Sequence, residues 1–212
     1  MSKTLFCSDL HLGHLRILLY EPVRRRLLWE RYFAKTESFD VFEARVLNFF
    51  ETSNWSELAK LIELHDNMII DNWNAVVGKD DVVWFLGDFC MGRRADVARY
   101  KSRLKGIIRM IKGNHDNFPN KVYLDAGFRS VSEYPVLLKS KFLLSHAPIE
   151  NTSTDTFYVN IFGHVHSSPE VPTDTDNTHC VCIERQNLTP KILQEFTDYY
   201  PPVFKEYETG AQ

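Results

Sequence analysis

Five short stretches of the sequence place metal-ligating side chains directly after an apolar run. They read DLH from Asp9, GD from Gly87, GNHD from Gly113, SH from Ser145 and GHVH from Gly163. Carboxylate and amide oxygens, together with imidazole nitrogens, suit a borderline divalent cation such as manganese, iron or zinc, and no thiolate is required. The residue types therefore predict metal chemistry.

The ligand-type side chains in these stretches are too many for one tetrahedral ion. There are seven of them: Asp9, His11, Asp88, Asn114, His146, His164 and His166. If one aspartate bridges, two ions can each take four protein ligands and still have room for water. Two ions about 3.5–4 Å apart can stabilise the attacking and the leaving oxygen of a phosphoryl displacement. Because only two of the ligands are carboxylates, the loaded site keeps a positive charge that attracts phosphate.

The elements that must position these residues can also be predicted. Apolar runs bounded by Gly, Asp, Asn or Pro predict strands at Thr4–Cys7, Asp81–Leu86, Gly106–Ile111, Val131–Leu138, Lys141–Leu144, Phe157–Phe162 and His179–Glu184. Helical spacing predicts helices at Leu58–Val77, Arg94–Leu104 and Pro190–Tyr200. The alternation predicts a mixed α/β fold, in which polar groups at strand ends gather at one edge of a sheet.

Residues 16–57 interrupt this alternation. The region is rich in arginine, glutamate and aromatic residues, has helical spacing and contains no strand candidate. We expect a helical insertion or cap after the first strand. Its run Arg24-Arg25-Arg26 is interpreted as a solvated helix face, and the alternative is a patch that binds phosphate or nucleic acid. The polar stretch Pro169–Thr178 predicts a loop.

Length and composition favour one domain over residues 1–212. Hydrophobic residues make up 44% of the chain, and the formal net charge of −3 gives no strong attraction to nucleic acid or membrane. The four cysteines form no CxxC pair, so we expect small buried residues in a reducing compartment. Without a signal peptide or an apolar run of about 18 residues, the sequence predicts a cytoplasmic protein and no membrane partner.

The order of the five stretches resembles the calcineurin-like metallophosphoesterase superfamily. The pattern of that superfamily is D-x-H, G-D, G-N-H-D or G-N-H-E, a lone H, and G-H-x-H. The similarity runs from Asp9 to His166, and the segment from Asn72 to Phe89 is similar to small phage and bacterial phosphoesterases. The resemblance implies a four-layer α/β/β/α sandwich, in which helices flank two central sheets and a dinuclear metal centre lies at the strand ends.

The resemblance also implies roles for individual residues. The ligands of one ion would be Asp9, His11 and His166. The ligands of the other would be Asn114, His146 and His164, with Asp88 bridging both. His115 matches the catalytic histidine that contacts the scissile phosphate and protonates the leaving group, and Asp116 would orient it. A metal-bridging hydroxide would attack phosphorus in line.

The implied activity is hydrolysis of a phosphate ester. We favour a phosphodiester, because the intact His115 and GHVH arrangement occurs in many diesterases and nucleases of the family. The alternatives are a phosphomonoesterase and a non-catalytic metal-binding scaffold for a protein partner, although no ligand is missing. The substrate would be a phosphorylated small molecule or a nucleotide. Nucleic acid is less favoured, because the chain is mildly acidic.

Three further residues are candidates for substrate binding. Arg93 and Arg94 follow the Asp88 loop and could hold phosphate oxygens, or could be exposed arginines at a helix start. His14 lies near Asp9 in the sequence and could contact substrate, with a capping or surface role as the alternative.

Overall fold

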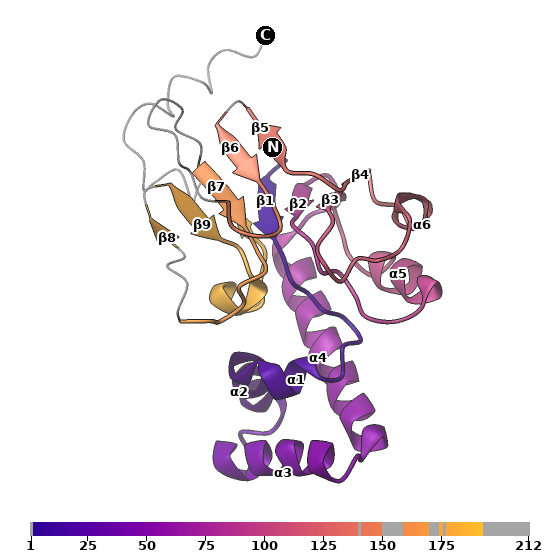
Figure 1. The fold of residues 1–212 in the computed structure, drawn as a ribbon. Helices are drawn as coiled ribbons and strands as arrows, with labels where there is room; N and C mark the ends of the chain where they lie inside the picture. Colours follow the sequence, from indigo (N-terminus) through magenta and orange to yellow (C-terminus); the bar gives the residue numbers. More distant parts are fainter. Residues whose placement is uncertain (1, 140, 150–158, 170–173, 176, 193–212) are drawn as a thin grey trace.

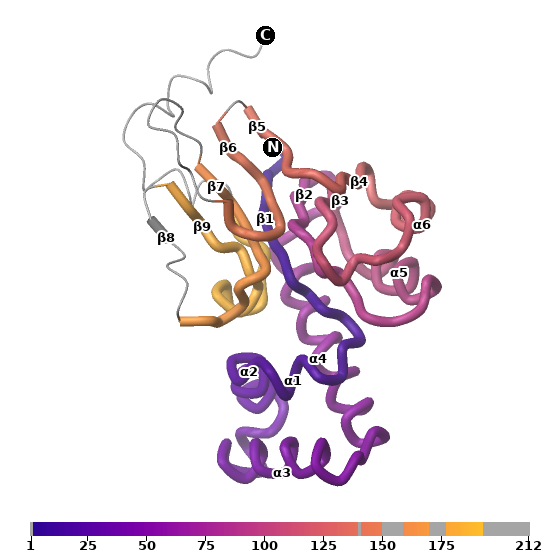
Figure 2. Tube along the Cα trace, in the orientation of Figure 1, coloured from indigo at the N-terminus to yellow at the C-terminus, as the bar shows by residue number. Residues whose placement is uncertain are grey.

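The computed structural model describes residues 2–139, 141–149, 159–169, 174–175 and 177–192. These residues form the predicted mixed α/β fold, with two five-stranded sheets and six α-helices (Figure 1). The chain trace shows the two sheets side by side, with a group of helices beyond one end of them (Figure 2). The strand ends that face this group position the candidate ligands.

The first sheet has the strand order β10-β1-β2-β3-β4. Its strands are β1 (Thr4–Cys7), β2 (Val82–Phe85), β3 (Ile107–Ile111), β4 (Ser130–Ser132) and β10 (Lys191–Ile192). β1 to β4 are parallel, and β10 pairs with β1 in the antiparallel direction. Cys7 pairs with Phe85 and Phe85 with Met110, so the carboxyl ends of β1, β2 and β3 reach the same edge.

The second sheet has the strand order β5-β6-β7-β9-β8. Its strands are β5 (Val136–Leu138), β6 (Phe142–Leu144), β7 (Val159–Phe162), β8 (Asp174–Thr175) and β9 (Thr178–Cys180). The central strands β6, β7 and β9 are parallel, and the two outer strands are antiparallel to their neighbours. Because Leu144 pairs with Ile161, the residues that follow β6 and β7 emerge together.

Six helices accompany the sheets: α1 (Ile17–Tyr20), α2 (Pro22–Tyr32), α3 (Phe39–Glu51), α4 (Trp55–Val76), α5 (Arg94–Lys101) and α6 (Asn120–Asp125). Residues 16–57 contain α1 to α3 and no strand, as predicted. The N-cap Asn54 accepts a hydrogen bond from the Glu57 amide, and α4 then runs from the α1–α3 group to the first sheet (Figure 1). Of the helices in the described part of the chain, none combines the length and the apolar character that a membrane span needs.

Two hydrophobic clusters fill the fold. The larger cluster, which includes Leu5 and Trp73, packs the helices against one face of the first sheet. The smaller cluster, which includes Phe6 and Ile161, lies between the two sheets. Successive residues of β1 enter different clusters because side chains alternate along a strand, so β1 is buried on both faces. The described layers are helices, first sheet and second sheet; a fourth layer stays a prediction.

The predicted strand Val131–Leu138 is wrong, because it is two strands in different sheets. β4 ends at Ser132, and β5 begins at Val136 in the second sheet. Pro135 lies at the break and has no amide hydrogen to donate to a strand ladder. The chain changes sheets at this point.

Three predictions near the carboxyl end also need correction. The predicted strand His179–Glu184 is too long, because β9 ends at Cys180 and a 3₁₀-helix follows at Ile183–Gln186. The predicted helix Pro190–Tyr200 is wrong at residues 191 and 192, which pair with β1, while residues 193–200 lie outside the described residues. The predicted loop Pro169–Thr178 contains the short strand β8. At Lys191 and Ile192, pairing with the distant strand β1 overrides local preference.

The interpretation of Arg24-Arg25-Arg26 as a solvated face is wrong for two of the three residues. Arg24 is 0% exposed and Arg25 is 7% exposed. Arg24 contacts Glu184 and two backbone carbonyls, and Arg25 pairs with Glu43 at 2.8 Å. Burial also rules out the substrate-facing alternative for both residues. The predicted burial of the four cysteines is confirmed, and all four are free thiols.

We expect Trp73→Phe to lower the free energy of unfolding by about 1–3 kcal/mol, because the Lys105 carbonyl would lose its donor. Trp73 is fully buried, and its indole Nε1 donates to the Lys105 oxygen at 3.0 Å. Trp55→Phe is the control: Trp55 begins the same helix, is 45% exposed, and should cost less than about 0.5 kcal/mol. Urea denaturation measures both, and equal losses would contradict the assignment of Trp73 to the core.

Candidate metal centre

The candidate ligands meet where the carboxyl ends of both sheets converge. Asp9, Asp88 and Asn114 follow β1, β2 and β3 of the first sheet. His146 and His164 follow β6 and β7 of the second sheet. Loops from two sheets thus bring together residues that are far apart in the sequence.

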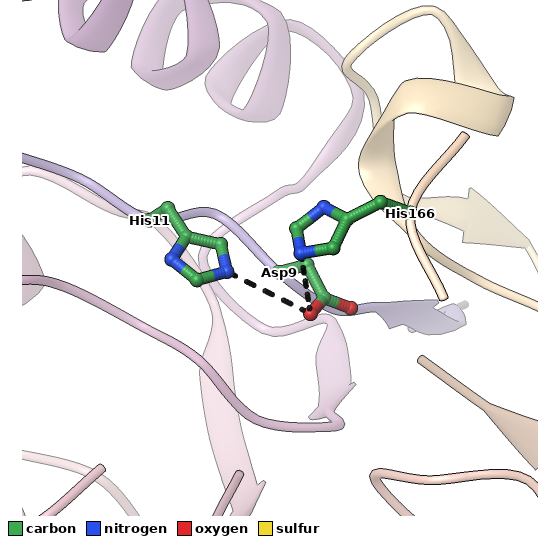
Figure 3. Close-up of side chains that lie close together, drawn as sticks. All are labelled: Asp9, His11 and His166. Atoms are coloured by element: carbon green, nitrogen blue, oxygen red, sulfur yellow. Dashed lines mark ion pairs between the residues drawn. The ribbon is translucent and has the colours of Figure 1, made fainter. Parts of the chain in front are cut away.

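The first group of ligand atoms belongs to Asp9, His11 and His166, which point toward one another (Figure 3). Asp9 Oδ1 lies 3.9 Å from His11 Nε2 and 3.7 Å from His166 Nε2. Asp9 is 0% exposed and His11 is 2% exposed, yet Asp9 Oδ1 and both ring nitrogens of His11 have no hydrogen-bond partner. Unpaired buried polar atoms are costly, so this group fits a cation.

Asp88 links this group to a second one. Its Oδ2 lies 3.4 Å from His11 Nε2 and 3.5 Å from His146 Nε2. Its Oδ1 accepts a hydrogen bond from the His115 amide at 2.9 Å, which fixes the carboxylate. One oxygen of a single aspartate therefore faces ligand atoms on both sides, as a bridging ligand must.

The second group belongs to Asn114, His146 and His164. His146 Nδ1 lies 2.8 Å from the Leu86 carbonyl, which can only accept, so Nδ1 carries the hydrogen and Nε2 holds the lone pair. His146 Nε2 lies 2.9 Å from Asn114 Oδ1 and 3.2 Å from His164 Nδ1. The Asn114 amide oxygen beside the lone pair of His146 Nε2, with the His164 ring alongside, fits a shared cation.

Five of the seven candidate ligands have left-handed backbone conformations. The φ angles are 60° at Asp9, 48° at His11, 60° at Asp88, 72° at His164 and 48° at His166. Each such conformation costs a non-glycine residue about 1–3 kcal/mol and persists only where its surroundings hold it. The Asp9 amide donates to the Gly87 carbonyl at 2.9 Å, and the His11 amide to the Asp88 carbonyl at 3.0 Å. The loops are thus tied to each other.

Close packing requires glycine at the start of the GNHD and GHVH motifs. A Cβ on Gly113 would lie 2.8 Å from Asp88 N and closer still to Asp88 Oδ1. A Cβ on Gly163 would lie 2.5 Å from Asp9 Oδ2 and overlap the Ser8 hydroxyl. Glycine therefore lets the loop after β3 approach Asp88, which follows the neighbouring strand β2, and lets the loop after β7 approach Asp9 from the other sheet.

Burial and neighbouring charges together set the pKa values of several candidate ligands. Burial raises the pKa of Asp88, and the nearby Asp9 carboxylate adds to the rise. Burial lowers the pKa of His11 and of His164, which keeps both rings neutral, as metal ligands must be. Although burial opposes it, the hydrogen bond and charge of Glu184 raise the pKa of His166 to about 9.

The structure places His115 and His14 beside the first group. The His115 ring is exposed, and its centroid lies 5.3 Å from that of His11. The His14 ring lies 5.3 Å from His11 and 6.4 Å from His115. Burial lowers the pKa of His14 to about 4, and the neighbouring His115 adds to this effect.

Asp116 does not orient His115 in the way that the resemblance implies. Its Oδ2 accepts from the amides of Asp88 at 2.6 Å and Gly113 at 2.9 Å, and its Oδ1 from the Phe89 amide at 3.1 Å. Burial raises the pKa of Asp116 to about 6. The carboxylate therefore holds the two loops together at the base of the site.

The predicted substrate-binding roles of Arg93 and Arg94 stay predictions. Both are exposed at the start of α5, where the Arg93 amide donates to Asp96 Oδ2 at 2.8 Å. Within the described residues, no hydrogen bond or ion pair joins either arginine to a candidate ligand.

Two residues behind the first group were missed by sequence reasoning. Glu184 Oε1 accepts a hydrogen bond from His166 Nδ1 at 2.9 Å, and Arg24 Nε donates to the same oxygen at 2.6 Å. An acidic residue directly after the apolar run from Cys180 to Ile183 was the available signal for Glu184. Arg24 had none, because its burial depends on distant partners.

Comparison with known proteins agrees with this geometry. A family model described as calcineurin-like phosphoesterase matches residues 2–181. This chain belongs to the calcineurin-like phosphoesterase family. Members of the family are metal-dependent hydrolases of phosphate esters, and the ligand groups of this phosphoesterase suit divalent cations.

Individual relatives are similar over part of their length. The Gene 66 protein of Mycobacterium phage L5 is 33% identical over 129 residues, which cover 59% of this chain and 45% of the phage protein. Uncharacterized protein MJ1445 of Methanocaldococcus jannaschii is 37% identical over 109 residues, covering 50% of this chain and 56% of that protein. The chain thus spans about half the length of these curated relatives.

A solved structure shares the fold. The crystal structure of AQ665, a protein of unknown function from Aquifex aeolicus, aligns with a TM-score of 0.60 at 20% identity. The alignment covers 94% of this chain and all of that one. The likeness concerns the fold alone.

Gly113→Ala should cost the protein its metal and lower the free energy of unfolding by about 1–3 kcal/mol, because the added methyl group would displace Asp88. The matched control is Gly78→Ala, where the nearest atom to the new Cβ is an Asp81 carboxylate oxygen at 3.3 Å, away from the site. Elemental analysis after loading with manganese measures bound metal. Full metal content in Gly113→Ala would show that close packing at Asp88 is not needed.

Proposed function

We propose that this protein is a dinuclear metal-dependent phosphoesterase that prefers phosphodiesters. The main supporting observation is that Asp88 Oδ2 lies 3.4 Å from His11 Nε2 and 3.5 Å from His146 Nε2, between the two ligand groups. In the first group, Asp9 Oδ1 and both His11 ring nitrogens have no hydrogen-bond partner. The proposal takes residues 1–212 as one domain, in which residues 16–57 are an insertion in a four-layer sandwich.

Each side of Asp88 would hold one divalent ion. Asp9, His11 and His166 supply one oxygen and two ring nitrogens to the first. Asn114, His146 and His164 do the same for the second. Such oxygen and nitrogen sets suit manganese, iron or zinc. When bound, two such ions would activate water for attack on phosphorus and neutralise the charge on the phosphate.

His115 is the candidate general acid. Its amide is fixed to Asp88 Oδ1 at 2.9 Å, and its exposed ring lies 5.3 Å from the His11 ring. An exposed imidazole beside the ligand groups supports this role. The ring would give a proton to the leaving oxygen as the ester bond breaks. Asp116 would act by holding the Asp88 and Gly113 amides, which keeps the bridging carboxylate in place.

The preference for a diester rests on the rim of the site. Tyr20 is 56% exposed, and its ring lies 6.4 Å from that of His14. Arg16 is exposed four residues earlier and has no ion-pair partner within the described residues. Residues four apart share one face of a helix. The aromatic ring of Tyr20 can stack on a base, which would be one of the two organic groups of the diester. The guanidinium of Arg16 can bind a neighbouring phosphate. A base and a phosphate are both features of a nucleotide substrate.

The activity is tested with metal-stripped protein reloaded with manganese. We expect bis-p-nitrophenyl phosphate to be hydrolysed faster than p-nitrophenyl phosphate, and chelator to abolish both reactions. Turnover of the monoester alone would identify a phosphatase instead. Two bound metals without turnover of either ester or of any nucleotide diester would overturn the enzymatic proposal and favour a binding scaffold.

His115→Ala should lower kcat by about 10²- to 10⁴-fold for esters with poor leaving groups, because these depend on protonation. The loss should shrink for nitrophenol, which leaves without help. Steady-state rates for a series of aryl phosphodiesters, with metal content measured alongside, test the role. An equal loss across the series would mean that His115 positions the substrate and donates no proton.

Tyr20→Ala should raise KM for a dinucleotide about 5- to 100-fold, which corresponds to about 1–3 kcal/mol for one stacked base. Tyr20→Phe should keep most of the affinity, and methyl p-nitrophenyl phosphate, which has no base, should be unaffected. Trp55→Ala removes another exposed ring, at the first residue of α4, and serves as the control. If Tyr20→Ala changed KM equally for the dinucleotide and for methyl p-nitrophenyl phosphate, Tyr20 would not bind a base.

A further inference from the structure

Arg24 is a fully buried cation that contacts the loop carrying the first ligand group. It lies on α2, in the helical region that precedes α4. Its Nη2 donates to the Asp9 carbonyl at 2.5 Å, and its Nη1 donates to the Leu10 carbonyl at 2.8 Å. The guanidinium therefore holds consecutive carbonyls of a turn in which Asp9 has a φ of 60°. Only the rigid fork of an arginine supplies several donors in this arrangement.

The same guanidinium holds Glu184. Arg24 Nε donates to Glu184 Oε1 at 2.6 Å, and Arg24 Nη2 also forms an ion pair with that oxygen. The side chains of both residues are 0% exposed. A buried carboxylate is stable only when paired, so Arg24 keeps Glu184 charged in the interior.

Glu184 in turn holds one of the metal ligands. Its Oε1 accepts from His166 Nδ1 at 2.9 Å, and the other ring nitrogen, Nε2, faces Asp9 Oδ1 at 3.7 Å. A carboxylate behind the ring of a ligating histidine fixes its tautomer and direction and makes the free nitrogen more basic. Arg24 thus supports two residues of the same ligand group: Asp9 through its backbone carbonyl and His166 through Glu184.

We propose that Arg24 and Glu184 are positioning residues that set the metal affinity of the Asp9–His11–His166 group. This inference rests on the proposed function, because it concerns one of the two proposed metal sites. It also gives α2 a role, because Arg24 on this helix supports the metal centre from the interior. Glu184 lies beyond residues 2–181, the part of the chain that the family model matches.

A third cation at Glu21, His166 and Glu184 is the competing arrangement, since their ligand atoms lie within 4.8 Å of one another. The contacts of these residues disfavour it. The Arg24 guanidinium already places a positive charge against Glu184, and Ser167 Oγ donates to Glu21 Oε2 at 2.6 Å. The number of metal ions bound decides between the two arrangements.

The test is manganese binding to the full chain, measured by isothermal titration and by electron paramagnetic resonance of the bound ions. The first variant is Glu184→Gln, which keeps the size of the side chain and removes its charge. The second is Arg24→Lys, which keeps the positive charge and removes the planar guanidinium with its several donors. We expect each variant to bind one of two manganese ions about 10- to 100-fold more weakly and the other unchanged. The magnetic coupling between the ions should then be lost at low manganese, while a single-ion signal remains.

Arg25 and Glu43 provide a matched control. They form an ion pair at 2.8 Å between α2 and α3, one residue along from Arg24. Arg25→Lys and Glu43→Gln should lower the melting temperature without changing either manganese affinity. This separates support of the metal site from support of the helices.

Three results would overturn the inference. Equal weakening in the control variants would show that the pair acts only through general stability. Unchanged binding in Glu184→Gln and Arg24→Lys would show that the pair does not act on the metal site. If the unaltered protein binds three manganese ions and Glu184→Gln binds two, Glu184 is itself a metal ligand. If the unaltered protein binds no manganese, the proposed function itself fails, which the same titration shows first.

Discussion

The rest of the structure depends on the position of the Asp88 carboxylate. One of its oxygens lies within 3.5 Å of His11 Nε2 and His146 Nε2, which belong to different ligand groups on different sheets. The other oxygen accepts the His115 amide, so the carboxylate cannot turn away. A group held between so many lone pairs is stable only if positive charge fills the space around it. These buried oxygen and nitrogen atoms, which come from both sheets, thus fit a cationic centre.

Much of the surrounding structure keeps strained loops in place. Asp116 uses both carboxylate oxygens on backbone amides beneath Asp88. Gly113 permits the close approach of the loop after β3. Arg24 holds the carbonyls of the turn after β1. Local conformational cost at the ligands is offset by contacts with residues from distant parts of the chain, which is usual at functional sites.

The sequence allows the candidate ligands to be grouped, because each motif directly follows an apolar run. A strand end fixes where its next residues emerge, and parallel strands bring those residues to one edge, so Asp9, Asp88 and Asn114 could be grouped without coordinates. The strand order and the second sheet were not predictable in the same way. The run Val131–Leu138 has strand composition throughout, yet it belongs to two sheets.

Other features could not be predicted because they depend on partners far away in the sequence. Three consecutive arginines resemble a surface run, and only the position of Glu184 explains why Arg24 is buried. Asp116 resembles a partner for its neighbour His115, but its oxygens bond to amides from the loops after β2 and β3. Lys191 and Ile192 form a strand because β1 offers a free edge. Local patterns carry no information about such long-range contacts.

The most direct test of the central claim is a crystal structure of the manganese-loaded protein with anomalous scattering recorded at the manganese edge. The account predicts two anomalous peaks about 3.5–4 Å apart, each next to one ligand group, with Asp88 within bonding distance of both. A single peak, or two peaks of which only one contacts Asp88, would contradict the account.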